Sequence, residues 1–351
     1  MQQRENERVD SFDFTIYNFT AKKFEWYKLN NIFNEGDYSA FQDFSKYYYP
    51  EVIVKSPPSK RKEKYIDERA CNFCKKKKPE VTFTKIAHLL PQLMGDKNLI
   101  HFHECDCCNE RFGLFENSFA NFIGVFRTID KMKGQAGIPI YKSPDKNLRL
   151  AFRAEKDIFT FDGRDGPVFN EKENKFVLTA TKNTYTPLHV MKCLYKIGYS
   201  ILFKEEIADY SPTLNILMSE ELDYLLPGAG HFARVYAFSF PTTFKTPTIF
   251  TYQKRDEFTR ENLPSKIIVI YFGRFMYQFI LPNKKDTFMY KKGEQSAWHL
   301  IPPIWDSNRM RLSGKLIDLS SDIPKKGDID VVDILLNDPL MRDKGSVDFP
   351  K

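Results

Sequence analysis

The chain has no long apolar run, and none of its segments approaches the ~20 consecutive apolar residues of a membrane-spanning helix. Its first ten residues, MQQRENERVD, are polar and charged and lack the apolar core of a signal peptide. There is also no internal repeat and no low-complexity segment, which argues against a repeat architecture. We therefore expect a cytoplasmic protein that does not bind a membrane.

Cysteine is scarce, with six residues in the chain, and this scarcity makes their placement informative. In the reducing cytoplasm, clustered cysteines favour metal binding over disulfides. The composition otherwise indicates a folded protein, since 42% of the 351 residues are hydrophobic and 15% are aromatic, with 32 Phe and 18 Tyr. A chain of this length can form two or three domains with a substantial core.

Five of the six cysteines and three of the six histidines lie in the stretch from Cys71 to Glu116. Four of these cysteines form two Cys-x-x-Cys pairs, with 30 residues between the pairs. Two such pairs supply the four thiolates of a closed, structural zinc site. Cys107 is a further possible ligand next to the second pair. The Cys-x-x-Cys spacing, which matches that of the first pair, favours these four ligands: Cys71, Cys74, Cys105 and Cys108.

The gap between the two pairs is longer than the common ribbon spacing of about 15–20 residues, so it holds an insert. His88 lies in that insert, and Asn109 directly follows the second pair. Free thiols without metal are the alternative interpretation of the cysteines. Cys193 stands alone on an apolar segment and is expected in the core.

The positive charge is concentrated in one segment. Lys55 to Glu80 contains ten basic and four acidic residues, a net charge of +6 out of +7 for the whole chain. A local basic patch fits a polyanionic partner, and a solvated lysine-rich loop is the equally weighted alternative.

The remaining patterns predict an α+β protein. Alternation of apolar and polar residues over 138–183 indicates antiparallel strands. A helix is expected from Asn109 to about Lys133, and another begins at Thr186-Pro187 with one buried face. Further strands are expected at 233–240 and 247–252, and a hairpin-like run with Gly273 at its middle is expected at 267–281.

These patterns divide the chain into five parts. An aromatic-rich segment (1–55) and a basic linker (56–68, with Ser-Pro-Pro-Ser) precede the cysteine-rich module (69–133). A larger α+β region (134–305) and a charged, peripheral tail (306–351) follow it. The sequence of the larger region does not say whether it recognises a target, senses a signal or oligomerises.

The stretch 69–130 resembles the HNH endonucleases, which have the ββα-metal fold, and in particular the subgroup with two zinc knuckles around the catalytic hairpin. The similarity is specific because five elements occur in the family's order. They are Cys71-x-x-Cys74, Ala87-His88-Leu89-Leu90-Pro91, Gly95-Asp96-Lys97-Asn98-Leu99, Cys105-x-x-Cys108-Asn109, and Phe112-Gly113 with Glu116.

The resemblance implies a role for each motif residue. His88 would be the general base that activates water, which requires a neutral imidazole. Asn98 would brace the loop that orients His88, with Asp96 as the alternative. Asn109 would bind one divalent metal, Mg²⁺ or Mn²⁺, through its amide oxygen, with a helix N-cap as the alternative role.

The position before the histidine departs from the family pattern. Many HNH nucleases have an acidic metal ligand there, whereas this chain has Ala87. Glu116 is a candidate for a metal-site or structural role, although it lies almost two helical turns beyond Asn109. The other acids near the second knuckle, which are alternatives or exposed residues, are Glu104, Asp106 and Glu110.

Several basic residues are candidates for binding nucleic acid. The four lysines after the first knuckle would contact phosphates without reading sequence. His101 and His103 share one face of the second strand, and they either contact the phosphate backbone or are ordinary exposed residues. His189, Lys192 and Lys196 follow a helical spacing and could face the cysteine-rich module, but a solvated face is expected for them. The four lysines are Lys75, Lys76, Lys77 and Lys78.

The resemblance thus implies a metal-dependent endonuclease that hydrolyses phosphodiester bonds, in double-stranded DNA, with a role in restriction or anti-phage defence by analogy with bacterial members. An activating partner or signal and a homo-oligomer are compatible with this reading. The alternatives are an HNH nuclease acting on RNA and a non-catalytic, zinc-stapled nucleic-acid-binding protein.

Overall fold

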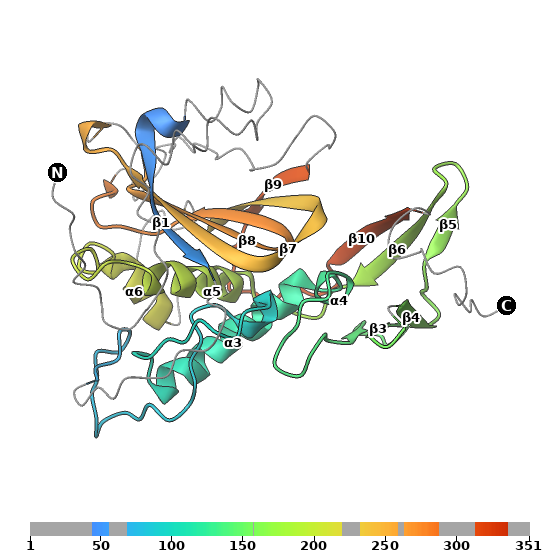
Figure 1. The fold of residues 1–351 in the computed structure, drawn as a ribbon, viewed down its shortest axis with the longest axis horizontal. Coiled ribbons are helices and arrows are strands. Elements are labelled where there is room, and N and C mark those ends of the chain that lie inside the picture. Colours follow the sequence, from blue (N-terminus) through green and yellow to red (C-terminus); the bar gives the residue numbers. More distant parts are fainter. Residues whose placement is uncertain are drawn as a thin grey trace.

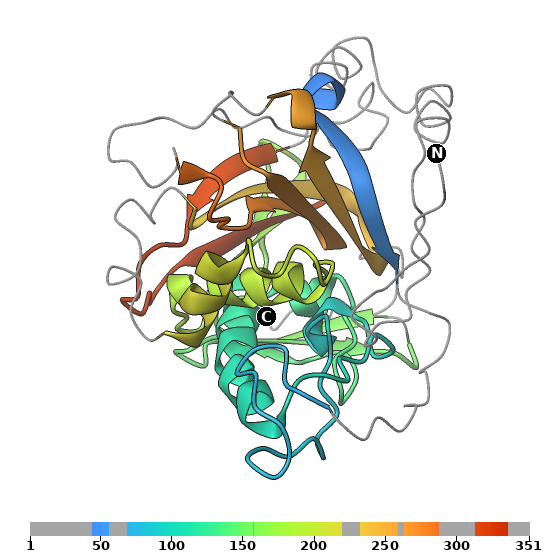
Figure 2. The same ribbon diagram turned by 90° about the vertical axis from the view of Figure 1, so that its left-hand side faces the viewer.

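The computed structural model describes residues 44–55, 69–156, 158–219, 232–258, 263–287 and 313–335. The predicted linker at 56–68 lies outside these residues. Figure 1 shows one large sheet on top, two helices (α5 and α6) beneath it, and a third (α3) beneath those, with smaller strands at one end. Figure 2, turned by 90°, shows the same order of layers. The predicted α+β class is confirmed, and its sheets are antiparallel.

The large sheet is built on β7 (Arg234–Lys254), which contains both strands predicted between 233 and 252. Strand β8 (Lys266–Ile280) pairs with one edge of β7. On the other edge, the first half of β7 pairs with β9 (Ser313–Asp318) and the second half pairs with β1 (Tyr48–Lys55). The sheet therefore joins segments from both ends of the chain.

Strand β8 is buried at every position except Arg274, as its continuous apolar run predicts for a strand covered on both faces. The hairpin predicted within this run is wrong, because β8 is a single strand. Gly273 has a φ of 50° and lies where the register between β7 and β8 shifts. A Cβ at Gly273 would lie 1.7 Å from Met132 Cε. Gly273 therefore lies in a β-bulge that packs closely against Met132, and it does not form a turn.

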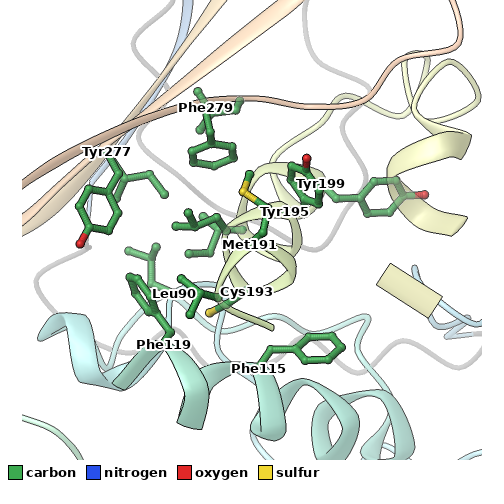
Figure 3. Packing of buried hydrophobic residues seen from close by; sticks show 14 of the residues in the cluster. Leu90, Phe115, Phe119, Met191, Cys193, Tyr195, Tyr199, Tyr277 and Phe279 are labelled. Atoms are coloured by element: carbon green, nitrogen blue, oxygen red, sulfur yellow. The ribbon is translucent and has the colours of Figure 1, made fainter. Parts of the chain in front are cut away.

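Helix α5 (Pro187–Ser200) follows Thr186 and begins at Pro187, as predicted, and α6 (Ser211–Met218) packs beside it. Every residue of α5 except His189 is buried, so the helix has no solvated side. In Figure 3, α5 lies between Tyr277 and Phe279 of β8 and Phe115 and Phe119 of α3 (Asp106–Ile123).

The helix predicted from Asn109 to Lys133 is interrupted at Gly124. Helix α3 ends at Ile123, and a short helix, α4 (Phe126–Ile129), follows. Gly124 has a φ of 63°, and a Cβ there would lie 2.4 Å from Asp330 Oδ2. The interruption therefore depends on a contact with a residue from the far end of the chain.

The antiparallel strands predicted over 138–183 are confirmed and form two small sheets. The first contains β2 (Tyr141–Lys142), β3 (Leu148–Arg153) and β4 (Ile158–Gly163). In the second, β6 (Lys175–Thr181) pairs with β5 (Val168–Asn170) and with β10 (Ile329–Leu335).

The parts of the chain are more closely integrated than the sequence suggests. Residues 313–335, expected in a peripheral tail, supply β9 and β10, while residues 48–55 supply β1. One hydrophobic core also runs from the cysteine-rich module into the helices and the large sheet, since Cys71, Leu89, Phe119, Leu194 and Ile270 all belong to it. Among the described helices, none is long and apolar enough to cross a membrane.

Candidate functional site

Four cysteine thiols meet at one point next to the start of α3. The Sγ atoms of Cys71, Cys74, Cys105 and Cys108 all lie within 4.8 Å of one another, and Cys74 Sγ is 3.7 Å from Cys105 Sγ. Zn–S bonds of about 2.3 Å in a tetrahedron place sulfurs about 3.8 Å apart, so the cluster fits a structural zinc. Cys107 is exposed and outside the cluster, which settles the choice of partner in the second pair.

The thiols also have the electrostatics of a metal site. A hydrogen bond from Cys108 lowers the pKa of Cys71 to about 4, against the opposing effect of burial. Burial raises the pKa of Cys105 to about 12, and the hydrogen bond to Cys71 together with burial raises the pKa of Cys108. One ionised thiolate at this point therefore disfavours ionisation of the neighbouring thiols, and four thiolates can lie together only with a cation between them.

The two knuckles are tied together by their backbones. The Asn72 N–H donates to His103 O at 2.8 Å, and Arg69 Nη1 donates to Phe102 O at 3.0 Å. Asp106 adds a third tie, because its carboxylate accepts hydrogen bonds from Thr82 and Thr84 at 2.5–3.1 Å. These bonds outweigh the effect of burial and hold the pKa of Asp106 well below its usual value.

His88 lies on a minimal β-hairpin between the knuckles. It pairs with Ile100 in an antiparallel bridge, and the hairpin is continued by hydrogen bonds from Leu89 N to Leu99 O and from His101 N to Ala87 O, each 2.9 Å. The hairpin and α3 together are the ββα arrangement that the sequence predicts. His88 is 9% exposed.

The imidazole of His88 is held by Gln92, which belongs to the short 3-10 helix η1 (Gln92–Met94). Gln92 Nε2 is 2.6 Å from His88 Nε2. This contact fixes the orientation of the ring, and an amide side chain can serve either tautomer of an imidazole, since it carries both a donor and an acceptor.

The loop of the hairpin is braced by Asp96. Its Oδ1 accepts the backbone N–H groups of Asn98 at 2.9 Å and Leu99 at 2.8 Å, and the residue is 1% exposed. Asp96 therefore braces the loop, the role for which it is expected as the alternative to Asn98. The assignment of that role to Asn98, which is half-buried, stays a prediction.

We expect Asp96→Ala to loosen the hairpin and destabilise the protein by about 2 kcal/mol, because two backbone donors lose a charged acceptor. Asn98→Ala is the matched control and is expected to cost less than about 1 kcal/mol. Urea unfolding of the two variants measures the difference. Equal losses of unfolding free energy would show that Asp96 is not the brace.

Asn109 lies in the first turn of α3 and is half-buried. Its alternative role as N-cap is wrong, because Cys105 occupies the N-cap position and Asn109 N donates to Cys105 O at 2.9 Å. The amide oxygen of Asn109 is therefore not used as a cap. Its role as a metal ligand stays a prediction.

Two lysines of α5 face the module, which is the alternative named for them above. The solvated face predicted for Lys192 and Lys196 is wrong, since each is 1% exposed. Lys196 Nζ donates to the backbone carbonyl of His88 and lies 3.2 Å from Glu104 Oε2. The signal for their burial was present: the segment PLHVMKCLYKIGYS has no polar face on which a lysine could reach water.

Glu104 and Glu116 are the two carboxyl groups near the buried ammonium of Lys196. Burial raises the pKa of Glu104 to about 7, with Lys196 opposing the shift, and burial raises the pKa of Glu116 in the same way. Glu104 forms an ion pair with Lys196, and Asp106 accepts hydrogen bonds from Thr82 and Thr84. Glu110 is exposed and forms a 3.6 Å ion pair with Lys85. The role of Glu116 at a metal site stays a prediction. Within the described residues, the four cysteines are the one group of three or more His, Cys, Asp or Glu side chains whose ligand atoms lie together.

The candidate nucleic-acid contacts differ in how exposed their side chains are. All four lysines of the run are exposed, and Lys75 Nζ also donates to Asn72 O at 2.5 Å. His101 is 1% exposed, and its ring centroid is 5.4 Å from that of Phe73, so it is neither an exposed strand residue nor available to a phosphate. Burial, with Lys196 and His103 nearby, holds the pKa of His101 well below its usual value.

His103 is half-buried, and its Nδ1 is 3.1 Å from Ala70 O. It therefore contributes to the docking of the two knuckles. Its proposed contact with the phosphate backbone stays a prediction.

Comparison with known proteins gives one match. Residues 71–121 match the family model described as HNH endonuclease, and this segment spans both knuckles, the hairpin and most of α3. Searches of curated proteins and of solved structures returned no match. The resemblance based on the motifs is thus confirmed for this segment, which matches the HNH endonucleases and contains a four-cysteine cluster that fits a structural zinc.

Proposed function

We propose that this protein is an endonuclease that hydrolyses phosphodiester bonds in double-stranded DNA with the help of Mg²⁺ or Mn²⁺. The observation that carries the proposal is the placement of His88 on a hairpin between two zinc knuckles, beside α3, within the segment that matches the HNH endonucleases. The nuclease class rests on that match. The substrate, the metal and the biological role are further parts of the proposal.

In the proposed reaction His88, as a neutral imidazole, accepts a proton from a water molecule whose oxygen attacks phosphorus, while the P–O bond to the leaving oxygen breaks and that oxygen takes up a proton from solvent. Gln92 orients the ring through its contact at His88 Nε2. Asn109 would hold the divalent cation through its side-chain oxygen. A cation with one protein ligand keeps water and substrate phosphate as its other ligands, which is common for Mg²⁺, and it would neutralise charge developing on the phosphate.

A nucleic-acid substrate is supported by the basic surface beside the module, and duplex DNA is the substrate that the resemblance to HNH endonucleases suggests. Lys76, Lys77 and Lys78 are exposed next to the first knuckle and offer phosphate contacts without sequence reading. We further propose a role in restriction or phage defence in the cytoplasm, where the cysteines stay reduced and available to zinc. The regions outside the module would then recognise a target, respond to an activating partner or assemble copies of the chain.

Incubation of the purified protein with supercoiled plasmid in Mg²⁺ or Mn²⁺ tests the proposal. We expect nicked and linear products, which EDTA suppresses, and little digestion of an equal mass of tRNA. Preferential loss of the tRNA would instead identify an RNA nuclease. If both substrates stay intact, also in cell lysate that supplies missing partners, while a gel shift shows binding, the protein is a binding module and not an enzyme.

A further inference from the structure

Helix α5 carries two buried lysines one turn apart, and they have different partners. Lys192 Nζ donates to Ser219 O at 2.6 Å, at the end of α6. Lys196 Nζ donates instead to the carbonyl of His88, on the hairpin of the nuclease domain. The lysine that contacts His88 thus belongs to the region that follows the nuclease domain and lies outside the segment that matches the HNH endonucleases.

Lys196 binds more than one part of the nuclease domain. Its ammonium lies 3.2 Å from Glu104 Oε2, in the segment that leads from the hairpin into α3, and both side chains are almost fully buried. Glu116, on α3, is close enough to favour the charged form of Lys196 as well. The ammonium therefore lies among the hairpin, the second knuckle and α3, which are the elements that carry His88, the zinc ligands and Asn109.

A buried ammonium is a costly way to stabilise a protein. Removing its charge from water costs several kcal/mol, and packed apolar side chains of the same volume are often as stable or more stable. Apolar side chains do pack at this point, since the ring centroid of Phe112 lies 5.9 Å from Lys196 Nζ. What an apolar side chain cannot supply is a donor for the His88 carbonyl. Packing alone therefore does not account for a lysine at position 196.

We infer that Lys196 is a positioning residue for His88: it fixes the backbone of the proposed general base from outside the HNH segment. Gln92 holds the imidazole and Lys196 holds the carbonyl, so the histidine is constrained at both ends. Because α5 packs on β8, with the ring centroids of Tyr195 and Phe279 6.4 Å apart, the large sheet supports the position of His88 through α5. This inference rests on the proposed role of His88.

Three variants of the full-length protein test the inference. Lys196→Met removes the donor, and Lys192→Met is the matched control on the same helix with the same burial. Glu104→Gln combined with Lys196→Met removes both members of the ion pair, so that no buried carboxylate is left without its partner. For each variant, kcat and KM on plasmid DNA and the free energy of urea unfolding are measured.

We expect Lys196→Met to lower kcat at least tenfold with KM within a factor of two, since small misplacements of catalytic groups have effects of this size. Lys192→Met should lose stability while kcat stays within a factor of three. The double variant should regain stability relative to Lys196→Met but not kcat. Recovery of kcat in the double variant, or an equal loss of kcat in Lys192→Met, would show a merely structural role and overturn the inference.

A second measurement separates this inference from the proposed activity. In protein labelled with ¹⁵N-histidine, the imidazole signals of His88 can be assigned by their loss in His88→Gln. Lys196→Met should shift these signals and Lys192→Met should leave them in place. If the wild-type protein cleaves nothing but this pattern is seen, the nuclease proposal fails and the positioning of His88 stands. If Lys196→Met leaves the signals unchanged, the positioning inference is wrong whatever the activity.

Discussion

His88→Ala is expected to abolish cleavage of plasmid DNA while leaving DNA binding unchanged. Removal of a general base lowers the rate by about 10²–10⁴-fold. The phosphate contacts proposed for Lys76, Lys77 and Lys78 do not involve the imidazole, so binding should persist. Initial rates of nicking and gel-shift titration with the same DNA measure the two effects.

His189→Ala is the matched control for this variant. His189 is half-buried at the start of α5, where its ring contacts Phe115 with a centroid distance of 5.1 Å. Its replacement should leave the rate within a factor of three. If His88→Ala retains wild-type cleavage, His88 is not the base. If it loses binding and cleavage together, with an unfolding free energy far below that of His189→Ala, the loss reports misfolding.

Cys71→Ser is expected to unfold the nuclease domain and to release its metal. A structural zinc contributes on the order of 10 kcal/mol to a small domain, and three thiolates with one hydroxyl bind it far more weakly. Metal analysis of the wild-type protein should find about one zinc per chain. In the variant, we expect the zinc content to fall and limited proteolysis to cut within 71–123.

Cys107→Ser is the control for the cysteine replacement, because Cys107 lies in the same turn as Cys108 but is exposed and outside the cluster. It should keep its zinc and its resistance to protease. Zinc loss in both variants would mean that the second pair is chosen differently, whereas zinc retained in Cys71→Ser would mean that the four thiols do not form the site.

The features that could be predicted from the sequence are those whose parts lie close together along the chain. The two Cys-x-x-Cys pairs, the hairpin around His88 and the start of α3 all fall within one short stretch, and their spacing restricts the geometry. The choice between Cys105 and Cys107 also followed from local spacing, and the thiol positions agree with it.

The features that could not be predicted depend on contacts between distant segments. Lys196 is buried because α5 lies between β8 and α3, and no pattern within α5 identifies the carbonyl of His88 as its partner. The space for a side chain at Gly273 is likewise closed by Met132, which is far away in the sequence, so the sequence alone does not distinguish a bulge from a turn there. Asp96 differs, because its two hydrogen bonds go to Asn98 and Leu99 nearby in the chain, a local pattern that is typical of Asp in turns.

The architecture of the large sheet has a consequence for synthesis on the ribosome. Strand β1 emerges before the nuclease domain, but its partner β7 emerges after it, and β9 is needed to complete the other half of β7. The four cysteines, by contrast, are all available as soon as α3 has left the exit tunnel. Local contacts form faster than distant strand pairings. We therefore expect the four cysteines to bind their metal early, whereas α5 can pack on β8 only after β8 has also emerged.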